Sequence, residues 1–119
     1  MIGLLYSTDL MFSSRVTATA KNRGVEVRVV TTADRLLLDQ DPEIRLVMID
    51  LFRLPASEWS RVVSSLKEME SPPHVVAYGP HVDEEVLTAA REAGCDEVLT
   101  RGQFHQTMGN LMSRWLGGG

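Results

Sequence analysis

Short apolar runs alternate with amphipathic segments along the whole sequence, and this alternation constrains the fold more than any other feature. A continuous apolar run is typical of a strand that is covered on both faces, as in a parallel sheet. Five runs are predicted to be strands, at residues 2–6, 25–31, 45–50, 74–78 and 97–100.

The segments between these runs carry apolar residues at helical spacing. Gly24 and Gly94 are placed to end the first and the fourth helix. The second helix is expected around residues 34–40, where the Leu36 to Leu38 run has no period but Pro42 lies just beyond. The residues that mark these stripes on the other four helices are Phe12, Val16, Ala20 and, at the end of the first helix, Arg23; Trp59, Val62, Val63, Leu66 and Met69; Val82, Val86, Ala89, Ala90 and Ala93; and Phe104, Met108, Leu111, Met112 and Trp115.

Five strands that are each followed by a helix predict a parallel α/β sheet, because parallel neighbours need long right-handed crossovers. The natural closure is the doubly wound, flavodoxin-like order of a (βα)5 domain. A chain of 119 residues is the size of one domain. We therefore expect a single domain over residues 1–116 and a flexible glycine tail at 117–119.

The composition of the sequence disfavours several classes of function. The sequence has 16 acidic and 12 basic residues, a net charge of −4 and no Lys/Arg cluster, which disfavours nucleic-acid binding. It has no transmembrane run or signal-type start, and Cys95 is its only cysteine, so we expect a cytoplasmic protein without a disulfide. No P-loop, GxGxxG, zinc or hydrolase-triad spacing is present, and we do not expect an enzyme or a resident cofactor.

The run RLVMIDLFRLP, at residues 45–55, ends its strand in one acidic residue, Asp50. Open α/β sheets place their sites at the carboxyl ends of strands, so Asp50 is a candidate functional residue. The alternative is that Asp50 is only the polar end of a buried strand.

The sequence resembles the receiver domains of two-component response regulators over residues 2–116. Asp50 followed by LFRLP matches the phospho-accepting aspartate of that family, with its short loop and proline. EAGCDEVLTRGQF, at residues 92–104, matches the glycine turn, the fifth strand and the lysine-proline-phenylalanine that follow. The resemblance implies the (βα)5 fold and a role in signalling and phosphorelay.

The same resemblance locates departures from the family pattern. Ser7 and Thr8 fall where receivers carry the acidic pair that binds magnesium, and Asp9 follows one position later. Gly79 or Pro80 falls at the hydroxyl position after the fourth strand, and Arg101 replaces the lysine. These departures are typical of a degenerate, or pseudo-, receiver, similar to small stand-alone bacterial proteins of that type.

We therefore expect a pseudo-receiver that acts by protein–protein contact and is not phosphorylated, with Arg101 reaching Asp50. The expected partner face is built by the fourth helix, the fifth strand and the fifth helix, and the expected oligomeric state is a monomer or weak homodimer. One alternative is a working phospho-acceptor that binds magnesium through Asp9 and Asp50. The other is a binder of small anionic ligands. The expected exposed partner contacts are Leu87, Arg91, Glu97 and Gln103, and the expected ligand-binding residues are Ser7, Thr8, Asp9, His81 and Arg101.

Overall fold

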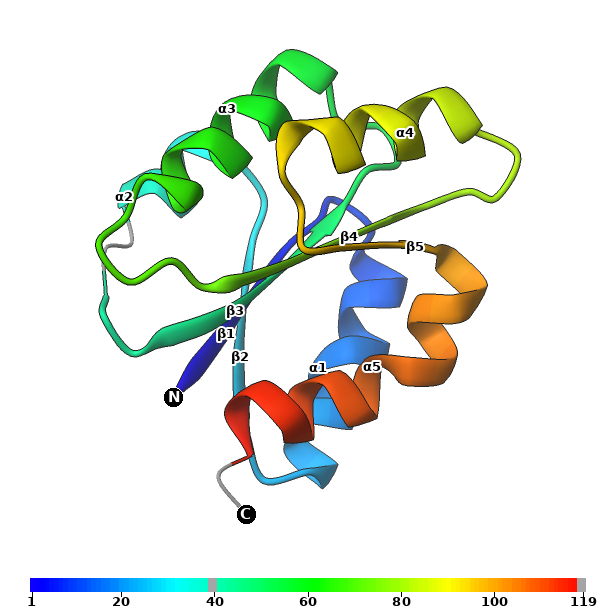
Figure 1. Cartoon of the computed structure of the whole chain (residues 1–119). Helices are drawn as coiled ribbons and strands as arrows, with labels where there is room; N and C mark the ends of the chain where they lie inside the picture. Colours follow the sequence, from blue (N-terminus) through cyan, green and yellow to red (C-terminus); the bar gives the residue numbers. More distant parts are fainter. Residues whose placement is uncertain (39–40, 118–119) are drawn as a thin grey trace.

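The computed structural model describes residues 1–38 and 41–117 and contains a five-stranded parallel sheet in the order β2-β1-β3-β4-β5 (Figure 1). The doubly wound α/β fold predicted from the sequence is confirmed. The strands are β1 (Ile2–Tyr6), β2 (Glu26–Val30), β3 (Ile44–Asp50), β4 (His74–Gly79) and β5 (Glu97–Thr100).

Helices cover both faces of the sheet. Figure 1 shows α1 and α5 on one side, and α2, α3 and α4 on the other. Two apolar clusters fill the spaces between the sheet and these two layers. The helices are α1 (Leu10–Asn22), α2 (Ala33–Leu38), α3 (Ala56–Lys67), α4 (Glu84–Ala93) and α5 (Arg101–Leu116). None of the helices in the described ranges is long and apolar enough to cross a membrane.

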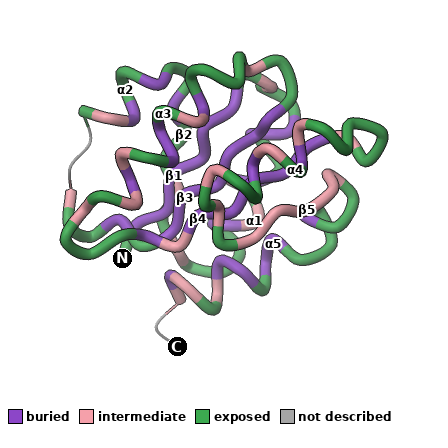
Figure 2. The backbone as a smooth tube through the Cα atoms, turned by 45° about the horizontal axis from the view of Figure 1, so that its top comes forward, coloured by how far each residue is buried: buried purple, intermediate pink, exposed green. Residues whose placement is uncertain are grey.

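The inner strands are buried along nearly their whole length, whereas the edge strands are not (Figure 2). Every residue of β1 is buried, and so is every residue of β3 except Arg45. β2 and β5 close the two edges and keep much of their surface accessible. The continuous apolar run at 45–50 is thus explained, because β3 lies at the centre of the sheet with helices on both sides.

The fourth helix differs from its prediction. Val82 was assigned to its apolar stripe, but α4 begins at Glu84 and the Val82 side chain is 78% exposed. Ala90 of the predicted stripe is buried, together with Leu87, which the stripe did not include. Val86, Ala89 and Ala93 pack only partly against the core. The sequence could not show this rotation, because a run of valine, leucine and small alanines offers more than one stripe at helical spacing.

The observed ends of other helices and strands differ from the predicted ends by one or two residues. The predicted strand at 25–31 is shorter, as β2, and α3 ends at Lys67, before the half-buried Met69. The second helix, expected at 34–40, is α2 (Ala33–Leu38), and positions 39–40 lie outside the described residues. Gly24 and Gly94 follow α1 and α4 with φ angles of 70° and 107°, a conformation that glycine adopts at no steric cost.

Candidate functional site at the carboxyl edge of the sheet

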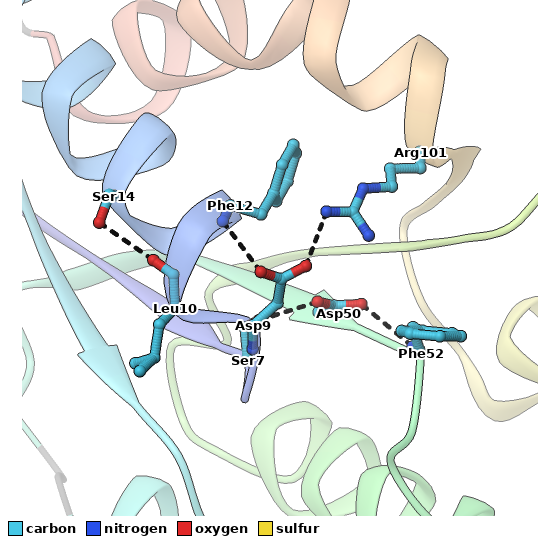
Figure 3. Close-up of polar contacts among 8 residues, drawn as sticks. All are labelled: Ser7, Asp9, Leu10, Phe12, Ser14, Asp50, Phe52 and Arg101. Atoms are coloured by element: carbon cyan, nitrogen blue, oxygen red, sulfur yellow. Dashed lines mark hydrogen bonds and ion pairs between the residues drawn. The ribbon is translucent and has the colours of Figure 1, made fainter.

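The carboxyl ends of β1, β3 and β5 bring four polar residues together (Figure 3). Asp50 is the last residue of β3, and Ser7 and Asp9 follow β1 directly. Arg101 is the first residue of α5 and follows β5 without a loop. Parallel strands end at the same edge of a sheet, so residues far apart in the sequence meet there.

Asp50 lies at the bottom of this site with only 2% of its surface exposed. The hydroxyl of Ser7 donates a hydrogen bond to Asp50 Oδ2 at 2.8 Å, and the backbone N–H of Phe52 donates to Oδ1 at 3.0 Å. Burial raises the pKa of Asp50, against the lowering effect of these two hydrogen bonds. Both carboxylate oxygens therefore already have protein donors.

Asp9 lies nearer the surface and joins two elements. Its Oδ1 accepts from the backbone N–H of Phe12 at 3.0 Å and caps α1, and its Oδ2 accepts from Arg101 Nη2 at 2.7 Å. The hydrogen bond from Phe12, followed by that from Arg101, lowers the pKa of Asp9. The Arg101 guanidinium also lies over the Phe12 ring, 4.4 Å from its centroid.

The prediction that Arg101 reaches Asp50 is wrong. Arg101 forms its ion pair with Asp9, which lies near the surface of the site. Asp50 lies deeper and accepts a hydrogen bond from Ser7. The cap at the start of α1 fixes the Asp9 carboxylate beside Phe12, and a long arginine packs on this ring more readily than it enters a buried pocket.

The other predicted site residues do not join this cluster. Gly79 ends β4, and a Cβ on it would lie 3.5 Å from Leu51 and 3.6 Å from Leu87. Thr8 is exposed, and His81 lies in an exposed turn before α4, where it lines a separate depression with acidic residues. The expected convergence of Ser7, Thr8, Asp9, His81 and Arg101 on one ligand is therefore not found, since Ser7 is buried and His81 lies apart.

The expected partner face also needs one correction. Leu87 was predicted to be an exposed contact, but it is 5% exposed and packs in the core beneath Gly79. Arg91 and Gln103 are exposed, as expected of contact residues, although the Gln103 side chain also closes a capping box with Thr100. Glu97 is half-buried and bonded to His74 at 2.5 Å.

Tyr78 lies beside Asp50 and was not among the site residues predicted from the sequence. Tyr78 pairs in register with Asp50, and its ring stacks on Phe104 with centroids 4.1 Å apart. Its hydroxyl is buried and has no hydrogen-bond partner within the described part of the chain. Burial, and then the charge of Asp50, raises the pKa of Tyr78. The available signal was a tyrosine at the end of an apolar strand, directly before Gly79.

The donor set does not fit a divalent cation of the kind that receivers use. Magnesium prefers several oxygen ligands, usually from more than one carboxylate. Here both oxygens of Asp50 accept hydrogen bonds, and the outward oxygen of Asp9 is bonded to a guanidinium. Within residues 1–38 and 41–117, no three His, Cys, Asp or Glu side chains are arranged to hold a metal ion.

This strand order and the acidic residue at the end of β3 define the chain as a receiver-like, or CheY-like, domain fold. It is similar to a response regulator from Hahella chejuensis, with a TM-score of 0.80 and 14% identity over 96% of this chain and 93% of that one. It is also similar to the CheY-like protein TadZ from Pseudomonas aeruginosa PAO1, with a TM-score of 0.77 and 18% identity, over 96% of this chain and 98% of that one.

The manganese-bound form of response regulator Rcp1 has a TM-score of 0.73 and 19% identity, over 99% of this chain and 96% of that chain. These identities are low, so the similarity establishes the fold alone. Neither the family models nor the curated proteins give a match to the sequence.

Proposed function

We propose that this chain is a pseudo-receiver, a signalling module that acts by protein–protein contact without receiving a phosphoryl group on Asp50. The observation that carries the proposal is the Arg101–Asp9 ion pair above a buried Asp50 whose oxygens are both hydrogen-bonded. The Arg101 guanidinium thus supplies a positive charge at the place where a working receiver binds a divalent metal ion.

The chemistry of phosphoryl transfer supports this interpretation. An attacking carboxylate needs an ionised oxygen with a lone pair that faces the donor, and a cation that neutralises the crowded charge. Ser7 donates to one oxygen of Asp50, and burial raises the pKa of that carboxyl, so the charged carboxylate that must attack is disfavoured relative to an exposed aspartate. The guanidinium of Arg101 is tethered to α5 and paired with Asp9, so it cannot dissociate from the site as a bound metal ion can.

Partner binding follows as the remaining way for such a module to transmit a signal. Arg91 and Gln103 are exposed on α4 and α5, and we retain them as candidate contacts of a protein partner. We propose no enzymatic activity, no nucleic-acid target and no membrane attachment, in line with the net charge of −4 and the absence of a basic cluster in the sequence.

The test is exposure to acetyl phosphate and magnesium, followed by intact-mass spectrometry. We expect no added phosphoryl mass on the wild-type chain. A matched gain-of-function variant combines Ser7→Asp with Arg101→Lys and should gain magnesium affinity and a labile phosphoryl adduct. Asp50→Asn on that background is the control and should abolish the adduct.

A phosphoryl adduct on the wild-type chain that disappears in Asp50→Asn would favour the second candidate, a working phospho-acceptor. The presence of a divalent cation in Rcp1, a protein of the same fold, is the observation in favour of that candidate. It requires Asp9 to release Arg101 and turn to the metal, so Arg101→Ala should then increase the phosphorylation rate.

The third candidate, binding of a small anion, depends on a depression of about 500 Å³ that Arg15, Arg101 and His105 line together with the carboxylate of Asp9. Calorimetric titration with inorganic phosphate tests it. A heat of binding that is lost in Arg101→Ala would favour it over the pseudo-receiver, whereas we expect none.

A further inference from the structure

The surface around the start of α1 combines exposed apolar side chains with arginines that lack an ion-pair partner. Leu10 and Met11 are 76% and 79% exposed, and Phe52 is 40% exposed. They border two adjoining depressions of about 500 and 360 Å³, to which Arg15 and Arg53 contribute. Neither arginine forms an ion pair with any residue of the described ranges. We call these five residues the basic groove.

The turn that leads into α4 has the opposite charge. Residues 82–85 place Val82, 78% exposed, beside the carboxylates of Asp83, Glu84 and Glu85. None of these carboxylates forms an ion pair within the part of the chain that the structure describes. Asp83 occupies the N-cap position of α4, yet its side chain makes no capping hydrogen bond. We call residues 82–85 the acidic turn.

Both surfaces lie at the same edge of the molecule. The basic groove is built by the segments that follow β1 and β3, and the acidic turn follows β4. In Figure 1 the loop into α4 lies on the right-hand side, beyond the end of β4, and α1 begins just after the end of β1. One edge of the chain therefore carries two complementary halves, which is the arrangement that a two-fold symmetric contact requires.

We propose that the occupant of the basic groove is a second copy of this chain, which inserts its acidic turn while its own groove receives the acidic turn of the first. Arg15 and Arg53 would face carboxylates that have no ion-pair partner in the monomer. Val82 would cover part of the apolar surface of Met11 and Phe52. This inference goes beyond the proposed function and does not depend on whether Asp50 is phosphorylated.

Other occupants fit this edge less well. A small anion would pair with arginine but would leave Leu10, Met11 and Phe52 exposed to water. An anionic membrane would contact the rim of the depressions without filling them, and the acidic turn at the same edge would be repelled by it. A second copy alone supplies both the apolar contact and the opposite charge from residues already described.

Sedimentation equilibrium of the full chain tests the proposal. We expect a monomer–dimer equilibrium with a Kd tighter than about 1 mM at about 20 mM NaCl. The dimer should weaken at least about tenfold at about 500 mM NaCl, because salt screens exposed charges over a few ångströms. Arg15→Glu and Glu85→Arg should each weaken it by a similar factor, since each places like charges opposite one another.

Mixing the two variants is the decisive measurement. Arg15→Glu and Glu85→Arg, combined in equal amounts, should form a heterodimer, because each half of the contact again pairs opposite charges. Lys21→Glu and Glu70→Arg are matched controls at exposed positions away from this edge and should dimerise like the wild-type chain. Circular dichroism of all four variants is the control for folding.

Three results would overturn the proposal. The first is a wild-type chain that is monomeric at about 1 mM and low salt. The second is a dimer that the controls weaken as much as Arg15→Glu and Glu85→Arg do. The third is a monomer that instead co-sediments with phosphatidylserine vesicles, which would assign the basic groove to a membrane. None of these results bears on the mass-spectrometric test of Asp50, so the two proposals fail independently.

Discussion

Asp9 has two functions at the start of α1. One carboxylate oxygen caps the helix through the N–H of Phe12, and the other binds Arg101 across 92 positions of the sequence. Ser7 meanwhile bonds to Asp50 beneath them. The side chains thus form two pairs, which the backbone N–H of Asp9 joins by donating to Ser7 Oγ at 3.1 Å. Arg101 acts on Asp50 only through space, where its charge partly offsets the rise in pKa that burial of Asp50 causes.

A double-mutant cycle should locate the partner of Arg101. Arg101→Ala and Asp9→Ala should show a coupling free energy of unfolding below about 1 kcal/mol, because both side chains are partly exposed and solvent screens the pair. Asp9→Ala should cost about 1 kcal/mol more than Arg101→Ala, since it also removes the cap of α1. Denaturant unfolding provides the measurement. A larger coupling between Arg101 and Asp50 would contradict the observed pairing.

The charge of Asp50 should destabilise the folded chain at neutral pH. Burial raises the pKa of Asp50 in the folded state, so the folded chain binds this proton more strongly than the unfolded chain does. Its contribution to stability is therefore fully present below the ordinary aspartate pKa of about 3.9 and is lost as the pH rises through the folded-state pKa. Asp50→Asn should raise the free energy of unfolding at pH 7.

The same variant should show little difference from the wild-type chain at about pH 2.5, well below the ordinary aspartate pKa, where the carboxyl of Asp50 is protonated in both states. Chemical denaturation over a pH series checks this. A variant that is less stable than the wild-type chain at pH 7 would show that the hydrogen bonds from Ser7 and Phe52 outweigh the cost of burial.

At the scale of elements, the two tryptophans anchor helices in different ways. Trp59 of α3 is 2% exposed and lies in the apolar cluster on its side of the sheet. Trp115 of α5 is half-buried and stacks on His74 of β4, with centroids 4.0 Å apart and planes 12° from parallel. The sequence predicted both as helix-packing residues, and the two differ in how much of the ring is enclosed.

Truncating these tryptophans should separate the two environments. Trp59→Ala should cost on the order of 3–5 kcal/mol, the range for a fully enclosed aromatic ring. Trp115→Ala should cost about 1–2 kcal/mol, because the ring is only half-buried and part of the loss is its stack on His74. The measurement is the denaturant concentration at the unfolding midpoint, compared between variants whose m-values are equal. Equal costs would show that Trp115 is as well packed as Trp59.

At the scale of the whole molecule, the parallel sheet brings the candidate functional residues to its carboxyl edge. All five strands end there, so the buried Asp50, the Arg101–Asp9 pair, the basic groove and the acidic turn share one side of the chain. The opposite end carries a different set of contacts, such as Lys67 with Asp96 and His74 with Glu97. A dimer formed at the carboxyl edge would therefore leave this second set exposed.

The sequence by itself determined the strands, the helices and their alternation, because apolar period and turn residues act over a few neighbouring positions. It also placed Asp50 at the end of a buried strand, which the structure confirms. The partner of Arg101 was decided only by the tertiary structure. The sequence analysis expected Asp50, and the pairing with Asp9 depends on the helix cap, which holds the Asp9 carboxylate near the surface.

The same reason explains the errors on α4. Val82 and Leu87 lie five positions apart in a segment of mixed apolar residues, and either one is consistent with a stripe at helical spacing. The packing of α4 against the sheet buries Leu87 beneath Gly79 and leaves Val82 in water. Which apolar side chain is buried, and which carboxylate meets which guanidinium, is set by contacts between elements distant in the sequence, and local pattern carries no information about those contacts.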